Sequence, residues 1–549
     1  MAKYYTNTEE LELVADAIRE KGGTNAQLTF PNEFVSAIKA IPASSSSGSS
    51  GKKDVIFYDY DGTVVTSYSA NEFASLSAMP ANPTHTGLIA QGWNWSLANA
   101  KTYVAKYGEL NIGQMYVTQS GETEIDVEMH EGRLEPILTI CVNGTITVDW
   151  GDNTTPDTVT GTSLDIQQAV PHIYTSEGNY TISILATENN KYSFFGASNL
   201  AILHKNTSIY ENRVYTNTVK HIRIGNNVEI KNNAFQYCQS LSSITIPDDI
   251  TSIGNNSFQY CYLLSSITIP DSVTSIDGSA FYGCYSLSSA TIPNGVTSIE
   301  TTAFQYCNSL SNITIPDSVT SIGNNAFGGC YSLSSITIPD NVTSIGSGAF
   351  NNCYSISSAT IPDGITSIRN QMFQNCYPLS SITIPDSVKS IGNSAFSSCY
   401  TLSSITIPDG VTSIGTSAFY YCYSLSNITI PDGVTSIGDQ MFQSCYSLSS
   451  ITIPDGVTSI GKTAFQSCFS LTSITIPDCV TSIGNSAFQS CYGVKEYHIL
   501  PTTVPTGGTT MFANIPSDCI IYVPKGHLND YKTATNWSTY ASKMQEEPT

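Results

Sequence analysis

The sequence has few basic residues, few histidines and no long apolar run. Its 549 residues include 22 Lys and Arg against 44 Asp and Glu, which gives a net charge of −22. Because nucleic acids and anionic membranes are bound by basic side chains, this balance excludes nucleic acid as a partner and disfavours a membrane surface. No stretch of about 18 consecutive apolar residues exists, so no membrane insertion is expected. The N-terminus also lacks the apolar segment of a signal peptide.

The usual sets of catalytic and metal-binding side chains are missing as well. The 7 His residues are scattered, and no Ser/His/Asp constellation, phosphate-binding loop or metal cluster is recognisable. We therefore expect a protein that is not an enzyme and that holds no cofactor and no metal.

One motif resembles a catalytic loop. The stretch Asp59–Val64, with the sequence DYDGTV, follows the apolar Val55–Phe57. This resembles the nucleophile loop of haloacid-dehalogenase-type phosphatases, in which the first Asp attacks phosphorus and the second acts as acid and base. The parallel βαβ alternation of such a domain is absent, and Asp-Gly is an ordinary hairpin turn. The pattern therefore disfavours a phosphatase and leaves it as a remote alternative.

The dominant feature is a repeat of 23 residues. From about residue 221 to 500 the chain repeats the phrase SLSSITIPDGVTSIGxxAFxxCY. Repetition at 20–29 residues indicates a leucine-rich solenoid, in which neighbouring repeats must stack because none can bury its apolar face alone. Strand alternation predicts that Leu241, Ile244 and Ile246 point inward while Ser243 and Thr245 face outward.

Cysteine is frequent, but its spacing argues against disulfides. Twelve of the 15 cysteines recur every 23 residues and would stack with parallel Cβ vectors at the strand spacing of about 4.8 Å. A disulfide needs Cβ atoms about 3.8 Å apart that are turned toward each other. No CxxC pair or nearby His suggests zinc. We expect small buried apolar side chains at Cys238, Cys261, Cys284, Cys307, Cys330, Cys353, Cys376, Cys399, Cys422, Cys445, Cys468 and Cys491.

Two further rows follow from the repeat. The Pro-Asp turns place one carboxylate in most repeats, which is too few for calcium unless backbone oxygens join, so solvated aspartates are expected. The residue after each of the twelve repeating cysteines is nearly always aromatic. Such a row can stack on sugar rings, or it can simply shield the turn. The candidate ligand-contact residues are Tyr262, Tyr285, Tyr331, Tyr354, Tyr377, Tyr400, Tyr423 and Tyr446.

The chain before the repeats divides into four segments. Residues 1–42 have the pattern of two short amphipathic helices, and the Ser/Gly-rich residues 43–53 form a flexible linker. In residues 54–117 the stretch MPANPTHTGLIAQGWNWSL resembles small β-grasp repeats of bacterial surface proteins. Residues 118–200 alternate apolar and polar side chains in short runs, which predicts a β-sandwich.

The segment 118–200 also resembles a known domain family. ITVDWGDN and the later PHIYTSEGNYTISI are similar to the polycystic-kidney-disease (PKD) domain, with Trp150, His172 and Tyr174 at matching positions. In that family these residues are structural and the domain is a spacer. The resemblance therefore implies that His172 packs at a strand end and is not a ligand.

The last segment, residues 501–549, is expected to cap the solenoid. It has the pattern of one strand and an amphipathic helix, with Tyr531, Ala534, Trp537 and Tyr540 placed to cover the open end. A cap is required because the last repeat would otherwise expose its core and a free strand edge.

The repeat phrases closely resemble the BspA-like leucine-rich repeat family over residues 201–500. Members of that family are mostly adhesins and other surface proteins, with some components of phage particles. The stretch TNTEELELVADAIREKGGTNAQLTFPNEFVSAIKAI is similar to N-terminal modules of tail and baseplate proteins of phages of Gram-positive bacteria. Together these resemblances imply a mainly β fold, with a BspA-like solenoid preceded by a PKD-like β-sandwich and a small N-terminal helical module.

The function implied is that of a virion protein of the phage tail fibre or baseplate. Residues 1–42 would attach to other tail proteins, and the solenoid would bind a host cell-surface receptor, a glycan or a protein. Release by host lysis would explain a surface-type composition without an export signal, and tail attachment proteins are commonly homo-oligomers such as trimers. The alternative is a bacterial surface adhesin, located at the cell surface.

Overall fold

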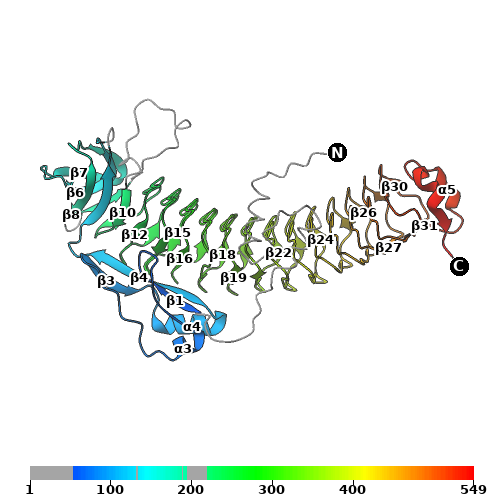
Figure 1. Ribbon diagram of the computed structural model, residues 1–549, viewed down its shortest axis with the longest axis horizontal. Helices are drawn as coiled ribbons and strands as arrows, with labels where there is room; N and C mark the ends of the chain where they lie inside the picture. Colours follow the sequence, from blue (N-terminus) through cyan, green and yellow to red (C-terminus); the bar gives the residue numbers. More distant parts are fainter. Residues whose placement is uncertain (1–53, 131–133, 188–189, 195–218, 549) are drawn as a thin grey trace, which may run out of the picture. The chain divides into compact units, whose positions relative to one another are not determined.

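The computed structural model describes residues 54–130, 134–187, 190–194 and 219–548 (Figure 1). They belong to two compact units, which we describe separately as Ser49–Leu333 and Ser334–Thr549. The helices predicted in residues 1–42 and the linker at 43–53 lie outside the described residues. Strands are the main regular structure of the described chain, as the predicted mainly β class requires, and in the repeats they are short and joined by turns.

Residues 54–118, here called the β module, form a mixed four-stranded sheet. The sheet order is β2-β1-β4-β3, with β1 and β4 parallel and the outer pairs antiparallel. Its core includes the fully buried Phe57 and Phe73 together with Trp93. The elements are β1 (Val55–Tyr58), β2 (Val64–Tyr68), α3 (Ala70–Ala74), β3 (Leu88–Trp93), α4 (Leu97–Tyr107) and β4 (Leu110–Thr118).

The next strands form a sheet that continues into the solenoid. β6 pairs with β9 and β8 at different points along its length, and β7 lies along it as well. β5 pairs with β10, the first strand of the repeats, and β9 pairs with β11. This domain therefore closes the N-terminal end of the solenoid by backbone hydrogen bonds. The strands are β5 (Thr123–Met129), β6 (Ile137–Asp149), β7 (Asp157–Pro171), β8 (Gly178–Ala186), β9 (Lys191–Phe194), β10 (Val219–Arg223) and β11 (Val228–Glu229).

The residues matching the PKD pattern pack against one another at one end of these strands. The rings of Trp150 and His172 are stacked with centroids 4.6 Å apart, and Tyr174 donates its hydroxyl to the Trp150 carbonyl at 2.8 Å. His172 Nε2 also lies 2.9 Å from Asp152 Oδ2. His172 is therefore a packed strand-end residue in this fold.

The short strands of the repeats form two parallel ladders, and from Thr383 to Ser450 the first ladder consists of isolated β-bridges. Partners lie one repeat apart, as for Ser367 with Ser390 and Ile368 with Ile391. The first ladder is built on the Ser-Ile-Thr positions. In Ser49–Leu333 it contains β10, β12 (Ser243–Thr245), β14 (Ser266–Thr268) and β16 (Ser289–Thr291). In Ser334–Thr549 it contains β19 (Ser335–Ile336), β21 (Ser358–Ala359), β27 (Ser473–Ile476), β29 (Glu496–Ile499), β31 (Ile520–Val523) and β32 (Met544–Glu546).

The second ladder is built on the Thr-Ser-Ile positions. In Ser49–Leu333 it contains β13 (Ser252–Ile253), β15 (Ser275–Ile276), β17 (Ser298–Ile299) and β18 (Ser321–Ile322). In Ser334–Thr549 it contains β20 (Ser344–Ile345), β22 (Ser367–Ile368), β23 (Ser390–Ile391), β24 (Ser413–Ile414), β25 (Ser436–Ile437), β26 (Ser459–Ile460), β28 (Ser482–Ile483) and β30 (Thr506–Gly507).

A third column of backbone hydrogen bonds lies at the Ala-Phe segment. Alternate residues donate their N–H to the next repeat, as in Ser394 to Thr416 and Phe396 to Ala418. Inside the column the Phe rings stack, with Phe396 and Phe419 5.8 Å apart and nearly parallel. Within each of the two units, neighbouring repeats are therefore joined by the ladders and by this column, with an apolar core of buried side chains between them.

The inward positions of the first repeat are as predicted, but the outward ones are not exposed. Leu241, Ile244 and Ile246 are at most 2% exposed, which confirms them as core. Ser243 and Thr245 point out of the solenoid and yet are only 7% and 2% exposed. They face outward as predicted, but they are not exposed, because the β module covers the first ladder in this part of the chain.

The β module reaches the ladder mainly through polar contacts. Asn111 Nδ2 donates to Asn312 Oδ1 at 2.5 Å, and the Tyr103 hydroxyl donates to the Ile315 carbonyl at 2.8 Å. Ser266 Oγ donates to the carbonyl of the β1–β2 turn at 3.1 Å. Hydroxyls and amides of this face thus find partners in the covering sheet, whereas the buried Thr245 Oγ1 has no hydrogen-bond partner among the described residues.

The C-terminal cap is formed by two short helices and one more strand. α5 (Leu528–Thr533) and the 3₁₀ helix Ser538–Lys543 replace the single helix that the sequence predicts, and β32 adds to the first ladder after them. Tyr531 and Trp537 are fully buried and Tyr540 is 8% exposed, which confirms three of the four predicted covering residues. Ala534 lies between the helices and is only partly buried.

Candidate functional site

Seven of the eight predicted ligand-contact tyrosines stack on a neighbouring aromatic ring. The rings of Tyr377 and Tyr400, for example, have centroids 4.7 Å apart and an interplanar angle of 6°. The spacing equals that of neighbouring strands, so the solenoid repeat itself sets the stacking distance. Other stacked pairs are Tyr262–Tyr285, Tyr354–Tyr377, Tyr400–Tyr423, Tyr423–Tyr446 and Tyr446–Phe469.

This stacking limits what the row can bind. Because neighbouring rings cover each other's faces, a sugar can reach only ring edges and hydroxyls along the stacked part. Tyr423 is 1% exposed, and burial raises the pKa of its hydroxyl, so it lies out of reach of a ligand. Tyr285 is 41% exposed. The remaining candidates, Tyr262, Tyr331, Tyr354, Tyr377, Tyr400 and Tyr446, are partly buried.

The cysteine ladder has a structural role. All 15 cysteines lie within the described residues and are free, and the ladder members are buried, as predicted. The Cys399 thiol donates to the carbonyl of Phe373 in the preceding repeat at 3.3 Å, and Cys445 donates to Phe419 in the same way. Burial raises the pKa of the Cys399 thiol, which keeps it protonated and able to donate. The ladder therefore links successive repeats.

The Asp59–Val64 motif is a hairpin turn between β1 and β2. Gly62 N–H donates to the Asp59 carbonyl at 3.0 Å, which closes the turn. The Asp59 carboxylate is buried beside His85, with Oδ2 2.7 Å from Nε2, and Asp61 Oδ1 accepts the Thr63 N–H. Asp61 thus makes a contact within the turn, whereas Asp59 also pairs with His85, which lies outside it.

No metal site accompanies the acidic residues of the described part of the chain. There, no group of three or more His, Cys, Asp and Glu side chains is arranged to hold a metal ion. The Pro-Asp aspartates are exposed, except for the half-buried Asp317, which lies 3.7 Å from Lys106 of the β module.

The outer side of the first ladder is open in Ser334–Thr549. The positions equivalent to Ser243 and Thr245 are exposed there through six successive repeats, so side-chain hydroxyls and one amide form two columns on this face. We call this surface the hydroxyl face. Its residues are Ser358, Thr360, Ser381, Thr383, Ser404, Thr406, Asn427, Thr429, Ser450, Thr452, Ser473 and Thr475.

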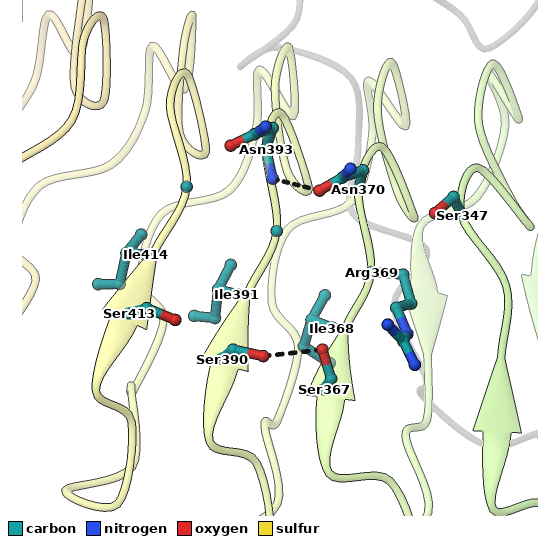
Figure 2. A pocket seen from close by; sticks show the side chains of 12 residues that line it. Ser347, Ser367, Ile368, Arg369, Asn370, Ser390, Ile391, Asn393, Ser413 and Ile414 are labelled. Atoms are coloured by element: carbon teal, nitrogen blue, oxygen red, sulfur yellow. Dashed lines mark hydrogen bonds between the residues drawn. The ribbon is translucent and has the colours of Figure 1, made fainter.

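The second ladder carries a groove of about 360 Å³ in the same unit (Figure 2). Ser367 and Ser390 hydroxyls lie 2.8 Å apart across two repeats, and the Asn393 N–H donates to Asn370 Oδ1 at 2.8 Å. Arg369 lies at one side of the groove with its side chain exposed.

Arg369 stands where the neighbouring repeats have glycine. Lys231 occupies the equivalent position at the start of the solenoid, where its ammonium group pairs with Asp165 at 2.9 Å. In the described part of the chain no carboxylate lies within ion-pair distance of Arg369. The sequence shows this exception to the Ile-Gly pattern, but periodicity does not indicate a role for it.

With this geometry in place, comparison with known proteins identifies the repeats. A family model described as the BspA type leucine rich repeat region matches residues 207–334, 297–426 and 412–529, more than half of the chain. The chain belongs to the BspA-type leucine-rich repeat family. No curated protein sequence matches it. In the described part of this BspA-type protein, no helix is long and apolar enough to span a membrane.

Solved structures similar to this BspA-type protein come from several bacteria. A leucine-rich repeat protein from Bacteroides ovatus is 26% identical, with 63% of this chain and 98% of that chain covered and a TM-score of 0.39. A leucine rich cell surface protein from Faecalibacterium prausnitzii is 36% identical, with coverages of 53% and 85% and a TM-score of 0.38. The pneumococcal vaccine antigen PcpA is 18% identical, with coverages of 64% and 98% and a TM-score of 0.35.

Proposed function

We propose that this BspA-type protein recognises a glycan of a bacterial cell envelope through the repeats of Ser334–Thr549. The observation that carries the proposal is the open hydroxyl face. The same face is covered in Ser49–Leu333 by the β module, through hydrogen bonds to side-chain hydroxyls and amides. The chain therefore already uses this surface chemistry for binding, and the exposed repeats offer it to a partner.

The chemistry of the hydroxyl face suits a polysaccharide. Hydroxyl groups both donate and accept hydrogen bonds, and they repeat along the first ladder at the strand spacing of about 4.8 Å. Each single hydrogen bond contributes only about 0.5–1.5 kcal/mol, so affinity would come from several repeats acting together. A polymer of sugars can meet several repeats at once.

We place this recognition in a phage tail fibre or baseplate. The support is the resemblance of residues 1–42 to tail and baseplate modules. In this proposal the β module and the PKD-like strands act as spacers, and the chains assemble as a homo-oligomer such as a trimer. We propose no catalytic role, because the Asp59 motif forms a hairpin turn and its Asp59 carboxylate contacts the Tyr60 N–H and His85. Mass spectrometry of purified phage particles and of host cell walls tests in which of the two the protein is located. Enrichment in the wall alone would favour a bacterial surface adhesin.

Binding is tested with the full chain on isolated wall polysaccharides and whole cells of Gram-positive hosts. The triple variant Thr383→Ala, Thr406→Ala, Thr429→Ala removes three exposed hydroxyls from the hydroxyl face. We expect at least about tenfold weaker binding, from three hydrogen bonds of the stated size. The matched control Thr412→Ala, Thr435→Ala, Thr458→Ala removes exposed threonine hydroxyls that precede the second ladder and should bind as the wild type does. Absence of binding to every envelope fraction by the folded chain would overturn the proposed function.

A further inference from the structure

The groove on the second ladder is formed by a local departure from the repeat. Arg369 replaces the glycine found at the same position in the repeats on either side, Gly346 and Gly392. A Cβ at Gly392 would lie 2.5 Å from the backbone nitrogen of Asn370, and one at Gly415 equally close to that of Asn393. These two positions cannot carry side chains without displacing the backbone. The floor of the groove therefore has no side chains at these two positions, and the Arg369 side chain lies at one side of the groove (Figure 2).

The polar groups along this groove are mainly hydrogen-bond donors. Asn370 and Asn393 use their Oδ1 atoms to accept backbone N–H groups of the next repeat, which leaves their Nδ2 groups to donate. Arg369 adds the five N–H donors of its guanidinium, and Ser367, Ser390 and Ser413 add hydroxyls. No carboxylate lines the groove, although the chain as a whole has a net charge of −22.

Such a set of groups selects for an anion that also carries hydroxyls. A guanidinium binds carboxylate and phosphate oxygens with paired, charge-assisted hydrogen bonds, and the amides and hydroxyls suit the remaining oxygens of a sugar. The groove extends over four successive repeats, from Ser347 to Gly415, so it can take an extended chain of residues. The net negative charge of this protein would repel an acidic partner elsewhere on its surface. The positive charge of Arg369 in a groove without carboxylates is therefore a local site where such a partner can bind.

We propose that the Arg369 groove binds an acidic polysaccharide, through carboxylates or phosphodiesters on the polymer. This inference rests on the proposed function and names the class of glycan. The carboxylates of a uronic-acid polymer and the phosphodiesters of a teichoic acid present the same chemistry to Arg369. The two sources are separated by experiment.

The test titrates the full chain with polygalacturonate, with a polyglycerol-phosphate teichoic acid and with neutral dextran, using calorimetry at low salt. Binding to one or both polyanions is expected, with polygalacturonate reporting carboxylates and teichoic acid reporting phosphodiesters. Arg369→Gly restores the residue of the neighbouring repeats and should weaken that binding at least tenfold. Arg369→Gln, which keeps a long polar side chain, should weaken it similarly. The matched control Lys462→Thr removes one exposed charge outside the groove and should change binding less than twofold.

The outcomes separate this inference from the proposed function. If the chain binds wall glycans but neither polyanion, or if both Arg369 variants bind the polyanions as tightly as the wild type, the acidic-glycan site is wrong and the proposed function stands. If Lys462→Thr weakens binding as much as Arg369→Gly, the effect is one of net charge and the groove is again excluded. Thermal unfolding of each variant, followed by circular dichroism, establishes that it is folded.

Discussion

At the residue scale, the Ala-Phe column of the solenoid holds ordinary L-residues in a left-handed conformation. Thr463 has φ of 50° and Ser467 has φ of 62°, and equivalent positions of most repeats share this conformation. It costs a residue with a Cβ on the order of 1 kcal/mol or more. The cost is offset by bonds between repeats, since Ser467 N–H donates to the Gln489 carbonyl at 2.9 Å.

This conformation predicts a stabilising substitution. Ser467→Gly should raise the free energy of unfolding by about 0.5–1 kcal/mol, because glycine adopts positive φ without a steric penalty. The chain already has glycine at the equivalent positions Gly283 and Gly329, with φ of 71° and 74°. Urea denaturation measures the change. Ser473→Gly is the control, since this strand residue has no positive φ and its replacement should lower stability by about 0.5–1 kcal/mol. Destabilisation by both variants would contradict the argument.

At the element scale, the β module lies on the first ladder at a point of very close approach. A Cβ at Gly113 of β4 would lie 2.4 Å from Thr268 Oγ1 of β14. We therefore expect Gly113→Ala to weaken the docking of the module by about 1–3 kcal/mol, as overpacking of an interface does. Hydrogen exchange of β12, β14 and β16 should then increase. Adding Thr268→Ala removes the obstructing atoms and should restore most of the protection, whereas a lack of rescue would show that the contact is not limiting.

A second prediction at this scale concerns the junction between β5 and β10. Arg223 donates to both Asp126 and Glu124, with Nη1 2.8 Å from Asp126 Oδ2. Burial alone would raise the pKa of Asp126, but its hydrogen bonds with Arg223 and Thr181 outweigh this and lower it. Because the pKa of Asp126 is lower in the folded state, the ionised carboxylate stabilises the fold at pH values above the ordinary pKa of Asp. This stabilisation is lost as the pH falls through the pKa of Asp126 in the folded state.

Replacement of this aspartate should therefore have a pH-dependent effect. Asp126→Asn should cost about 1–2 kcal/mol of unfolding free energy near pH 7, and the difference from the wild type should shrink as the pH falls below about 4. Chemical denaturation at several pH values measures it. Glu128→Gln, at the more exposed pair with Lys220, should have a smaller effect. A difference that stays constant down to low pH would exclude ionisation of Asp126 as the cause.

At the scale of the whole molecule, the repeat made much of the fold predictable and the rest depended on contacts between distant segments. Periodicity alone placed Leu241 and the cysteine ladder in the core. It could not bury Ser243 and Thr245, because their cover comes from the β module, more than 100 residues earlier in the chain. Spacing predicts the aromatic row around Tyr423, but the stacking of its rings depends on how the repeats are arranged in space. The sequence shows Arg369 as an exception to the Ile-Gly pattern, but only the structure shows that the glycines beside it form the floor of a groove.

Because each repeat contacts only its neighbours, the C-terminal cap should stabilise mainly the repeats next to it. Trp537 is fully buried, donates its Nε1–H to the Pro505 carbonyl at 2.8 Å and packs against Phe512. Trp537→Ala should cost about 3–5 kcal/mol, but only in the repeats next to the cap, because each repeat contacts only its neighbours. Hydrogen exchange should thus increase at β28 and β30, while amides near Phe396 keep their protection. Tyr492→Ala, at a side chain 55% exposed, is the control and should leave both regions unchanged. Uniform loss of protection across Ser334–Thr549 would mean that this unit unfolds as one cooperative block, with the cap controlling its stability as a whole.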